Sequence, residues 1–464
     1  MLTTDDFERT SQKLKTISPS FCAAKWLQVT LHLGTGTTHS CHHPAPHEIP
    51  LEELKDNPSA LHNTRFKKQQ RKMMLEGERP QECDYCWRVE DSKQDNAVYS
   101  DRITKSSEVW AAPHIDKIST MPWDVDINPT YLEVDFDTTC NFKCAYCSPS
   151  YSTTWMQEIK KHGPYVMPSM TFNDVSYMKP GKGLPFLQSE TNPYIDAFWK
   201  WIPDAIKDLQ YLRVTGGEPL LSKHTYKILD YLIENPQPEM EFGINSNLCV
   251  PKDVIDVFIE KMKIIQENKC VKSFKMFTSC EAYGEKAEYI RFGMNYDYWR
   301  SNLVRVIEEI PRSFSTVMAA YNVLSVTSFT DFLKDMLSIK QKYATLSRTL
   351  PLSIDVPYVR YPPFLAAWII TENFIKDMED SVTFMYRNRN WGPVFDGFYD
   401  FEVNRMERLY YVMRENMGEK ESNFQQRKNF YEFIQEYDKR RGTNFFETFP
   451  ELEGFYYYCR DKEL

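Results

Sequence analysis

The stretch Tyr131-Leu-Glu-Val-Asp-Phe136, followed closely by Cys140-Asn-Phe-Lys-Cys144-Ala-Tyr-Cys147, decides the fold predicted for this chain. The first six residues predict a strand. Three thiolates spaced by three and then two residues can wrap one face of a cubane iron–sulfur cluster, which leaves the fourth iron without a protein ligand. A structural zinc site normally takes four ligands, and no fourth Cys or His follows closely.

Residues 130–370 alternate short β-rich runs with amphipathic helical patterns. The predicted strands are Tyr131–Phe136, Tyr211–Val214, Glu241–Asn245, Lys272–Thr278, Ser315–Tyr321 and Leu352–Val356. The predicted helices include Lys223–Glu234, Lys252–Glu267, Tyr296–Glu309 and Phe329–Lys342. This alternation predicts parallel strands with crossover helices, and so an α/β fold. Its six units predict a partial (βα)6 TIM-like barrel, with the three cysteines at the C-terminal end of the first strand, where such folds place catalysis.

The composition changes on either side of this region. Residues 1–110 predict a small Cys-rich α+β domain, and residues 111–129, with several prolines, predict a linker. Within residues 130–370, the stretch Gly163–Asn192 predicts a loop over the barrel mouth. Residues 371–464 are charged and aromatic with helical periodicity, which predicts a helical C-terminal extension packed on the barrel.

The net charge and the cysteine content limit the classes of function that the chain can have. The chain has 464 residues and a formal net charge of −9, which argues against a broad electrostatic grip on nucleic acid. No apolar run is long enough to cross a bilayer and no signal pattern is present, so we expect no membrane association and a cytoplasmic protein. In a reducing compartment, the 11 cysteines favour metal binding or redox chemistry over disulfides.

The Cys-x3-Cys-x2-Cys pattern, with an aromatic residue before its last cysteine, resembles the signature of the radical S-adenosylmethionine (SAM) enzymes. The resemblance implies that Cys140, Cys144 and Cys147 hold a [4Fe–4S] cluster whose open iron is chelated by the amino and carboxylate groups of SAM. It also implies that an electron, from a reductant such as flavodoxin or ferredoxin, cleaves SAM into methionine and a 5′-deoxyadenosyl radical. That radical would abstract a hydrogen from the substrate.

Polar turns after the second and third predicted strands match further parts of this family. Gly216, Gly217 and Glu218 resemble the motif that receives the methionine amino group of SAM. The two glycines allow close backbone approach, and Glu218 offers a carboxylate to an ammonium group. Asn245 and Asn247 end the third strand with groups suited to a ribose or a carboxylate.

After the fourth predicted strand, Ser279 and Arg291 match the ribose-contacting Ser and the carboxylate-binding Arg of the family. Where the family often has an Asp near this Ser, the chain has Cys280-Glu281. No residue is assigned a catalytic role. Lone cysteines are more often small buried side chains than hydrogen donors, and we expect this of Cys249, Cys280 and Cys459.

A second predicted centre consists of the four cysteines Cys22, Cys41, Cys83 and Cys86. Four thiolates would close a tetrahedral zinc site or complete a four-cysteine iron–sulfur cluster, and spacing alone does not separate these. Their order around Leu51-Glu-Glu-Leu54 and Gly77-x-x-Pro80-x-x-Cys83-x-x-Cys86 resembles the SPASM and twitch modules. The resemblance implies an auxiliary [4Fe–4S] cluster, with zinc as the alternative.

In two other segments of the N-terminal region, we expect the charged or histidine side chains to be exposed to solvent. The segment Leu61–Leu75 predicts a basic helix whose charged face is solvated rather than bound to nucleic acid. The histidines around Cys41 could serve as ligands, but we expect them to be exposed loop residues; they are His39, His42, His43 and His47.

The resemblance leaves several substrates open. Enzymes with such auxiliary modules frequently modify peptides, so we expect a peptide or amino-acid-like group that is oxidised, crosslinked, epimerised or rearranged. The alternatives are a nucleotide or an aminoacylated nucleic-acid base, and dehydrogenation of a small molecule. Outside enzymes, the alternative is an iron–sulfur electron-transfer protein, against which the open coordination site argues.

Overall fold

The computed structural model describes residues 2–92, 99–180, 183–186, 191–344, 351–392, 394 and 396–461. The chain forms two compact units. The first unit is Met1–Thr138, Met178–Gly243 and Lys269–Ser273, and the second unit is Thr139–Tyr177, Ile244–Asn268 and Phe274–Leu464. The division into domains that the sequence predicts stays a prediction.

The first unit contains strands in the order β10-β4-β1-β2-β3. Their bounds are β1 Gln28–His32, β2 Thr37–His39, β3 His47–Glu48, β4 Tyr131–Asp135 and β10 Tyr211–Thr215. Both neighbours of β4 pair with it in parallel, whereas β2 pairs antiparallel with β1 and with β3. The Cys-rich N-terminal region therefore contributes β1, β2 and β3 to this sheet, and β1 joins them to β4 by parallel pairing.

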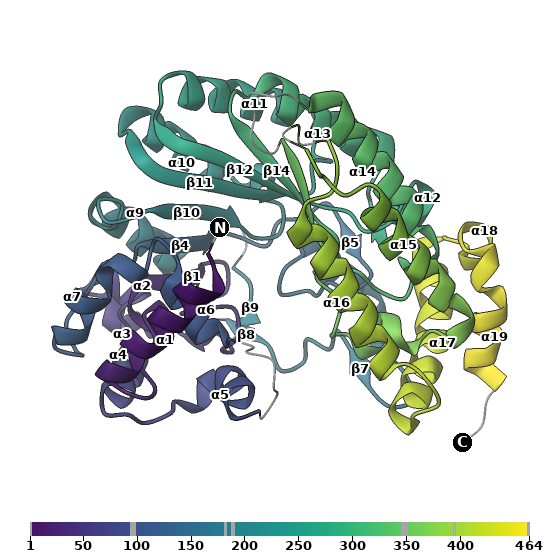
Figure 1. Cartoon of the computed structure of the whole chain (residues 1–464), viewed down its shortest axis with the longest axis horizontal. Coiled ribbons are helices and arrows are strands. Elements are labelled where there is room, and N and C mark those ends of the chain that lie inside the picture. Colours follow the sequence, from purple (N-terminus) through teal and green to yellow (C-terminus); the bar gives the residue numbers. More distant parts are fainter. Residues whose placement is uncertain are drawn as a thin grey trace. The chain divides into compact units, whose positions relative to one another are not determined.

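Helices of the first unit surround these strands (Figure 1). They are α1 Thr4–Ile17, α2 Ala24–Leu27, α3 Leu51–Leu54, α4 Arg65–Leu75, α5 Asp84–Asp91, α6 Asp101–Ser107, α7 Ile115–Thr120, α9 Pro193–Ala205 and α10 Lys223–Glu234. The segment predicted as a linker contains α7, and its Ile115 and Ile118 are buried in one apolar cluster with Trp26 and Trp87. Burial of these apolar side chains holds the segment in the first unit.

The second unit contains strands in the order β12-β14-β15, all in parallel. Its strands are β5 Lys143–Cys144, β6 Tyr165–Val166, β7 Thr171–Phe172, β13 Arg291–Phe292, β14 Ser313–Met318 and β15 Leu352–Asp355. The strands β11 Gln237–Ser246 and β12 Val271–Ser279 each run from the first unit into the second. The stretch predicted as a loop contains β6, β7 and two further short strands, β8 Lys179–Pro180 and β9 Gly183–Leu184; its residues 181–182 and 187–190 lie outside the described residues.

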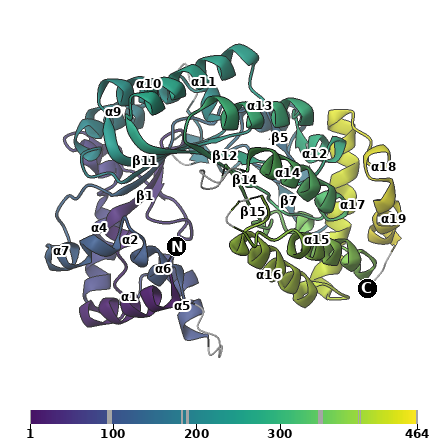
Figure 2. The ribbon, with the colours of Figure 1, turned by 45° about the horizontal axis from the view of Figure 1, so that its top comes forward.

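Most of the second unit is helical (Figure 2). Its helices are α8 Thr153–His162, α11 Lys252–Glu267, α12 Glu285–Ile290, α13 Tyr296–Glu309, α14 Phe329–Tyr343, α15 Ile375–Arg387, α16 Asp400–Asn416, α17 Glu421–Arg441, α18 Phe445–Thr448 and α19 Glu453–Asp461. The buried Glu402 of α16 accepts the backbone N–H of Ile354 in β15 (2.6 Å) and pairs with Lys340 of α14 (2.9 Å). This contact ties the C-terminal helices to the strands of their own unit.

All six strands predicted in residues 130–370 are present, and α10, α11 and α13 have the bounds that the sequence predicts. The mixture of parallel strands and helices makes this an α/β protein. Closure into a partial barrel stays a prediction. Within the described residues, no helix combines the length and the apolar character needed to cross a bilayer.

Candidate metal centres

The three-cysteine loop, residues 140–147, lies in the second unit. Its centre forms β5, which pairs antiparallel with β13 so that Cys144 lies opposite Arg291. The N–H of Ala145 donates to the carbonyl of Ile290 (2.8 Å), and the N–H of Cys147 donates to the carbonyl of Cys144 (2.9 Å). All three thiols are free of disulfides. The loop therefore has a fixed backbone and three available sulfur ligands.

The first turn of α8 holds this loop in place. Ser152 caps the helix and donates to the carbonyl of Phe142 (2.8 Å), while the N–H of Cys140 donates to Thr153 (3.2 Å). The fully buried Trp155 donates its indole N–H to the carbonyl of Cys144 (2.9 Å). These side chains satisfy backbone groups that the irregular loop would otherwise leave unpaired.

A C-terminal residue also supports the loop, which the sequence did not reveal. Arg441, at the end of α17, donates to the carbonyl of Lys143 (2.6 Å) and packs over the ring of Trp155 (4.6 Å to the centroid). Its guanidinium also pairs with Glu158 (3.3 Å), which in turn pairs with Lys143 (2.8 Å). The helical extension thus contributes a buried cation to the surroundings of the cysteines.

Arg291 lies beside Cys144 in a buried ion pair. Its Nε and Nη2 donate to Glu281 Oε2 (2.9 and 2.6 Å), and its Nη1 lies 3.7 Å from the Cys144 sulfur. The hydroxyl of Tyr146 donates to the other oxygen of Glu281 (3.1 Å). Burial raises the pKa of the Cys144 thiol, and the nearby Arg291 charge opposes that rise. Glu281, which stands near the position where the family often has an Asp, therefore orients Arg291.

Of the other residues predicted to contact SAM, Asn247 meets the loop directly. Its side-chain N–H donates to the side-chain oxygen of Asn141 (2.8 Å), which lies between the first two cysteines of the motif. Asn245 in β11 and Ser279 at the end of β12 are half-buried. Their roles toward a bound cofactor stay predictions.

The glycine turn Gly216-Gly217-Glu218 belongs to the first unit and follows β10. Gly216 has φ +134°, and a Cβ there would lie 2.9 Å from the carbonyl oxygen of Asp137. Only glycine fits this turn without strain. Glu218 is buried, and one of its oxygens accepts the N–H of Leu220 (3.0 Å). The backbone thus passes close to the carbonyl of Asp137 at this turn, and the role of the turn toward SAM stays a prediction.

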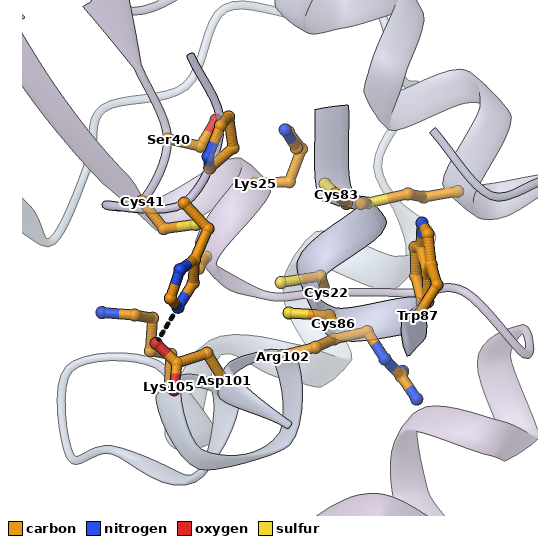
Figure 3. Close-up of a pocket in the computed structure, with 14 residues that line it drawn as sticks. Cys22, Lys25, Ser40, Cys41, Cys83, Cys86, Trp87, Asp101, Arg102 and Lys105 are labelled. Carbon is orange, nitrogen blue, oxygen red and sulfur yellow. Dashed lines mark hydrogen bonds and ion pairs between the residues drawn. The ribbon is translucent and has the colours of Figure 1, made fainter. Parts of the chain in front are cut away.

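The four N-terminal cysteines converge on one pocket of the first unit (Figure 3). They come from four places, before α2, after β2, at the start of α5 and in its first turn: Cys22, Cys41, Cys83 and Cys86. The space that they line measures about 400 Å³ including its opening. None of the four forms a disulfide. Among the described residues, no group of three or more His, Cys, Asp or Glu side chains is close enough to hold a single metal ion. As a donor set, four thiols suit a [4Fe–4S] cluster, which takes one thiolate at each iron, whereas a single zinc ion would need them closer together.

Buried charges surround this four-cysteine pocket. Lys25 is almost fully buried and forms an ion pair with Glu82. Burial alone would lower the pKa of Lys25, but Cys83 and Glu82 raise it, so the amine stays charged. Burial raises the pKa of the Cys83 thiol to about 12, with Lys25 opposing the rise. Free thiols of this kind are protonated at neutral pH, and binding a metal centre must release their protons.

Arg102 of α6 stabilises the backbone around the same pocket. Its guanidinium binds both oxygens of Glu90 (2.8 and 2.9 Å) and donates to the carbonyl of Phe21 (2.7 Å), next to Cys22. It also lies over the ring of Trp87 (5.7 Å to the centroid), next to Cys86. A bidentate pair of this geometry fixes the backbone beside two of the four cysteines.

The expectation of exposed histidines around Cys41 is wrong for His39. This residue is buried, with one ring nitrogen bonded to the carbonyl of Cys41 and the other 3.1 Å from His32 Nε2. Burial lowers the pKa of His39 to about 3. His43 is half-buried, stacks on Tyr85 and bonds to Asp101 (2.7 Å). The remaining two differ from each other: His42 is exposed, whereas His47 is half-buried and bonds to Thr64 (2.9 Å).

The expectation of a solvated basic helix is wrong for two residues of α4. Lys67 and Arg71 are both fully buried. Lys67 donates to the carbonyl of Gln28 (2.9 Å), and Arg71 donates to Asn63 (3.1 Å) and to the carbonyl of Lys25 (3.3 Å). Burial and the neighbouring Arg71 lower the pKa of Lys67. These long side chains satisfy backbone carbonyls beneath α2 and β1, which is why they point inward.

Of the lone cysteines, Cys280 and Cys459 are buried, as the sequence predicts. Cys249 is half-buried, and its thiol lies 3.6 Å from the carbonyl of Asn295. The buried Cys280 thiol lies 3.3 Å from the carbonyl of Ala282, so it is engaged locally.

No protein-family model matches this sequence, and no curated protein matches it significantly. Among solved structures, the chain is similar to the crystal structure of Streptococcus suis SuiB bound to precursor peptide SuiA. The two are 13% identical, and the match covers 82% of this chain and 72% of that chain with a TM-score of 0.34. A TM-score this low does not establish a common fold.

Proposed function

We propose that this chain is a radical SAM enzyme in which Cys140, Cys144 and Cys147 bind a [4Fe–4S] cluster and SAM occupies the open iron. The observation that carries the proposal is the three-cysteine loop itself. Its three thiols, none of them in a disulfide, stand on a backbone fixed by α8, β13 and α17, with a buried guanidinium at Cys144. A cluster with SAM bound would supply the 5′-deoxyadenosyl radical that abstracts a substrate hydrogen.

In this proposal the chain's own residues position the reactants. Arg291 places positive charge beside the Cys144 thiolate, and Glu281 holds Arg291 in orientation through two hydrogen bonds. Glu218, Asn245, Asn247 and Ser279 are proposed to contact SAM, with the Gly216-Gly217 backbone at its amino group. Trp155 and Arg441 hold the backbone of the loop by donating to the carbonyls of Cys144 and Lys143, while its three cysteines are half-buried.

The proposal extends to the whole chain. We assign the partial (βα)6 barrel to residues 130–370, a twitch-like module to residues 1–110 and a helical extension to residues 371–464. The four-cysteine pocket would hold an auxiliary [4Fe–4S] cluster, supported by four free thiols around one space and by the charged Lys25 beside Cys83. Zinc takes the same ligands and stays the alternative.

The substrate class proposed first is a peptide or an amino-acid-like group, with a cytoplasmic flavodoxin or ferredoxin as reductant. Nucleotides, aminoacylated bases and other small molecules are the alternatives. Genomic neighbours would separate these classes, because a precursor-peptide gene, a sugar pathway and nucleotide-modifying genes each point to one of them.

The experiment that tests the proposal is anaerobic reconstitution with iron and sulfide, followed by SAM and dithionite. We expect 5′-deoxyadenosine from the wild type, none from Cys144→Ala, and wild-type amounts from the matched control Cys270→Ala. Absence of product from a wild type that carries iron, or equal product from Cys144→Ala, would contradict the proposal. The first of these results would favour the electron-transfer protein.

A further inference from the structure

Three acidic residues alternate along β4 and just beyond it: Glu133, Asp135 and Asp137. In a strand, alternate residues point to the same face, and residues directly opposite on neighbouring strands share that face. In β1, Thr30 lies opposite Glu133 and His32 opposite Asp135. In β10, Arg213 lies opposite Glu133. We call this group, with Gln28, the carboxylate face; its members are Gln28, Thr30, His32, Glu133, Asp135 and Arg213.

Four oxygens on the carboxylate face are buried and lack hydrogen-bond partners among the described residues. They are Gln28 Oε1, Thr30 Oγ1, Glu133 Oε2 and Asp135 Oδ1. The exposed fractions of these residues are only 1%, 1%, 9% and 3%. Buried polar atoms are almost always paired, because an unpaired one costs about 1–3 kcal/mol. Four such atoms on one face of adjacent strands indicate a group that the chain itself does not supply.

The missing group must donate hydrogen bonds. An amide oxygen and two carboxylate oxygens only accept, and a hydroxyl can also accept. For Glu133 Oε2, the Arg213 guanidinium falls short, because its Nη1 lies 3.7 Å away, beyond hydrogen-bond distance. His32 Nδ1 approaches the other oxygen of Asp135 (3.4 Å) and leaves Oδ1 unpaired.

The charges on this face favour a cation. The carboxylates of Glu133 and Asp135 face one guanidinium, that of Arg213. Asp137 adds a third carboxylate, whose oxygen accepts the hydroxyl of Ser222 (2.6 Å). Burial raises the pKa of Asp135, His32 opposes the rise, and the carboxylates of Asp137 and Glu133 add to it. A bound positive charge would relieve this repulsion.

The glycine turn lies against the end of the face. A Cβ at Gly216 would lie 3.1 Å from Asp135 Oδ1, closer than ordinary van der Waals contact. Because Gly216 has no side chain, the unpaired oxygen is spared this crowding. We propose that the carboxylate face binds an ammonium group of a ligand.

We assign the ammonium group to an amine-bearing substrate, because the proposed function already gives the amino group of SAM to the Gly216-Gly217 turn. The assignment to a substrate rests on the proposed function, whereas the binding of an ammonium group does not. Binding to the face requires neither a cluster nor turnover, so it can be measured apart from SAM cleavage.

The experiment is calorimetry on the reconstituted protein without reductant, with three amine probes and matched neutral compounds. The amines are Nα-acetyl-lysine amide, agmatine and glucosamine; the neutral partners are Nα-acetyl-norleucine amide, butylurea and glucose. We expect at least one amine to bind tenfold or more tightly than its neutral partner. Glu133→Gln and Asp135→Asn should each weaken that binding at least tenfold, and the exposed control Glu78→Gln should not.

A parallel titration with SAM shows whether the face serves SAM instead. If amine probes do not bind but Asp135→Asn weakens SAM at least tenfold, the face holds the amino group of SAM, and the proposal is wrong. If no amine binds and SAM is unaffected, or if neutral compounds bind equally well, ordered water occupies the face and the proposal is wrong. Both substitutions keep side-chain shape, and unchanged iron content and near-UV circular dichroism would show that the variants are folded.

Discussion

The two groups of cysteines are built in different ways. The three-cysteine loop takes all its thiols from eight consecutive residues and fixes them by hydrogen bonds to backbone groups. The four-cysteine pocket gathers thiols from distant segments and surrounds them with buried charges, Lys25 and Arg102 among them. Three thiols would leave one iron of a [4Fe–4S] cluster without a protein ligand, whereas four thiols would supply a ligand to every iron. On the proposed function, the open set receives SAM and the complete set exchanges electrons.

Removing the three loop thiols should have the largest effect on the proposed difference between the two groups of cysteines. In the triple variant Cys140→Ala, Cys144→Ala and Cys147→Ala, we expect formation of 5′-deoxyadenosine to stop. Iron should fall from about eight to about four atoms per chain, because the four-cysteine pocket keeps its own cluster. Iron and sulfide analysis checks this. Complete loss of iron with zinc retained would show that the pocket is a zinc site.

Breaking the ion pair beside Cys144 should have the next largest effect. Glu281→Gln leaves the buried Arg291 charge without its partner, which we expect to cost about 3–5 kcal/mol of unfolding free energy. The double variant Glu281→Leu with Arg291→Met removes both charges and should be more stable than Glu281→Gln alone. Urea unfolding followed by circular dichroism measures both. A double variant less stable than the single one would contradict this account of the pair.

The Glu158 contacts under the loop should give a pH-dependent effect. Burial would raise the pKa of Glu158, but Arg441 and Lys143 lower it below its ordinary value of 4.5. A carboxyl with a lowered pKa stabilises the fold above its unfolded value, and this contribution is lost as the pH falls through the lowered pKa. We therefore expect Glu158→Gln to cost about 2 kcal/mol at pH 7, from lost hydrogen bonds to charged groups.

The difference between Glu158→Gln and wild type should shrink as the pH falls below 4.5. Urea midpoints measured from pH 7 to pH 3 check this, with the exposed Glu260→Gln on α11 as the matched control. A difference that stays constant over this range would show that the contacts do not depend on the charge of Glu158.

The smallest expected effect is a change in the midpoint potential of the cluster proposed for the four-cysteine pocket. In the triple-alanine background, Lys25→Met removes a buried positive charge and should lower the midpoint potential of the remaining cluster. A shift on the order of 60 mV corresponds to a tenfold change for a one-electron couple. Lys25→Met with Glu82→Gln should lie close to wild type, because the pair is neutral as a whole. Potentiometry followed by electron paramagnetic resonance measures this, and an unchanged potential in Lys25→Met would contradict the role given to Lys25.

Much of the secondary structure could be predicted from local patterns in the sequence. The apolar period of α10, α11 and α13 gave bounds that the structure reproduces, because those helices bury one regular stripe. The cysteine spacing likewise separated the two groups of thiols, whose roles as ligands stay predictions. The glycine turn was recognisable because only glycine permits its close backbone approach.

Contacts between distant residues could not be predicted in this way. Nothing local indicates that Arg441 of α17 reaches the carbonyl of Lys143, or that Lys67 and Arg71 turn inward to bond backbone carbonyls. The carboxylate face is a partial exception. Its alternation of apolar and acidic residues along β4 is visible in the sequence, but which neighbours share the face depends on strand order and register.

The measurement that tests the central claim most directly is electron paramagnetic resonance of each reduced cluster with and without SAM. One sample is Cys83→Ala with Cys86→Ala, which keeps the three-cysteine loop, and the other is the triple-alanine variant, which keeps the pocket. Because only the loop leaves an iron open, SAM should change the spectrum of the first sample and leave that of the second unchanged. A spectrum of the first sample that does not respond to SAM would contradict the account.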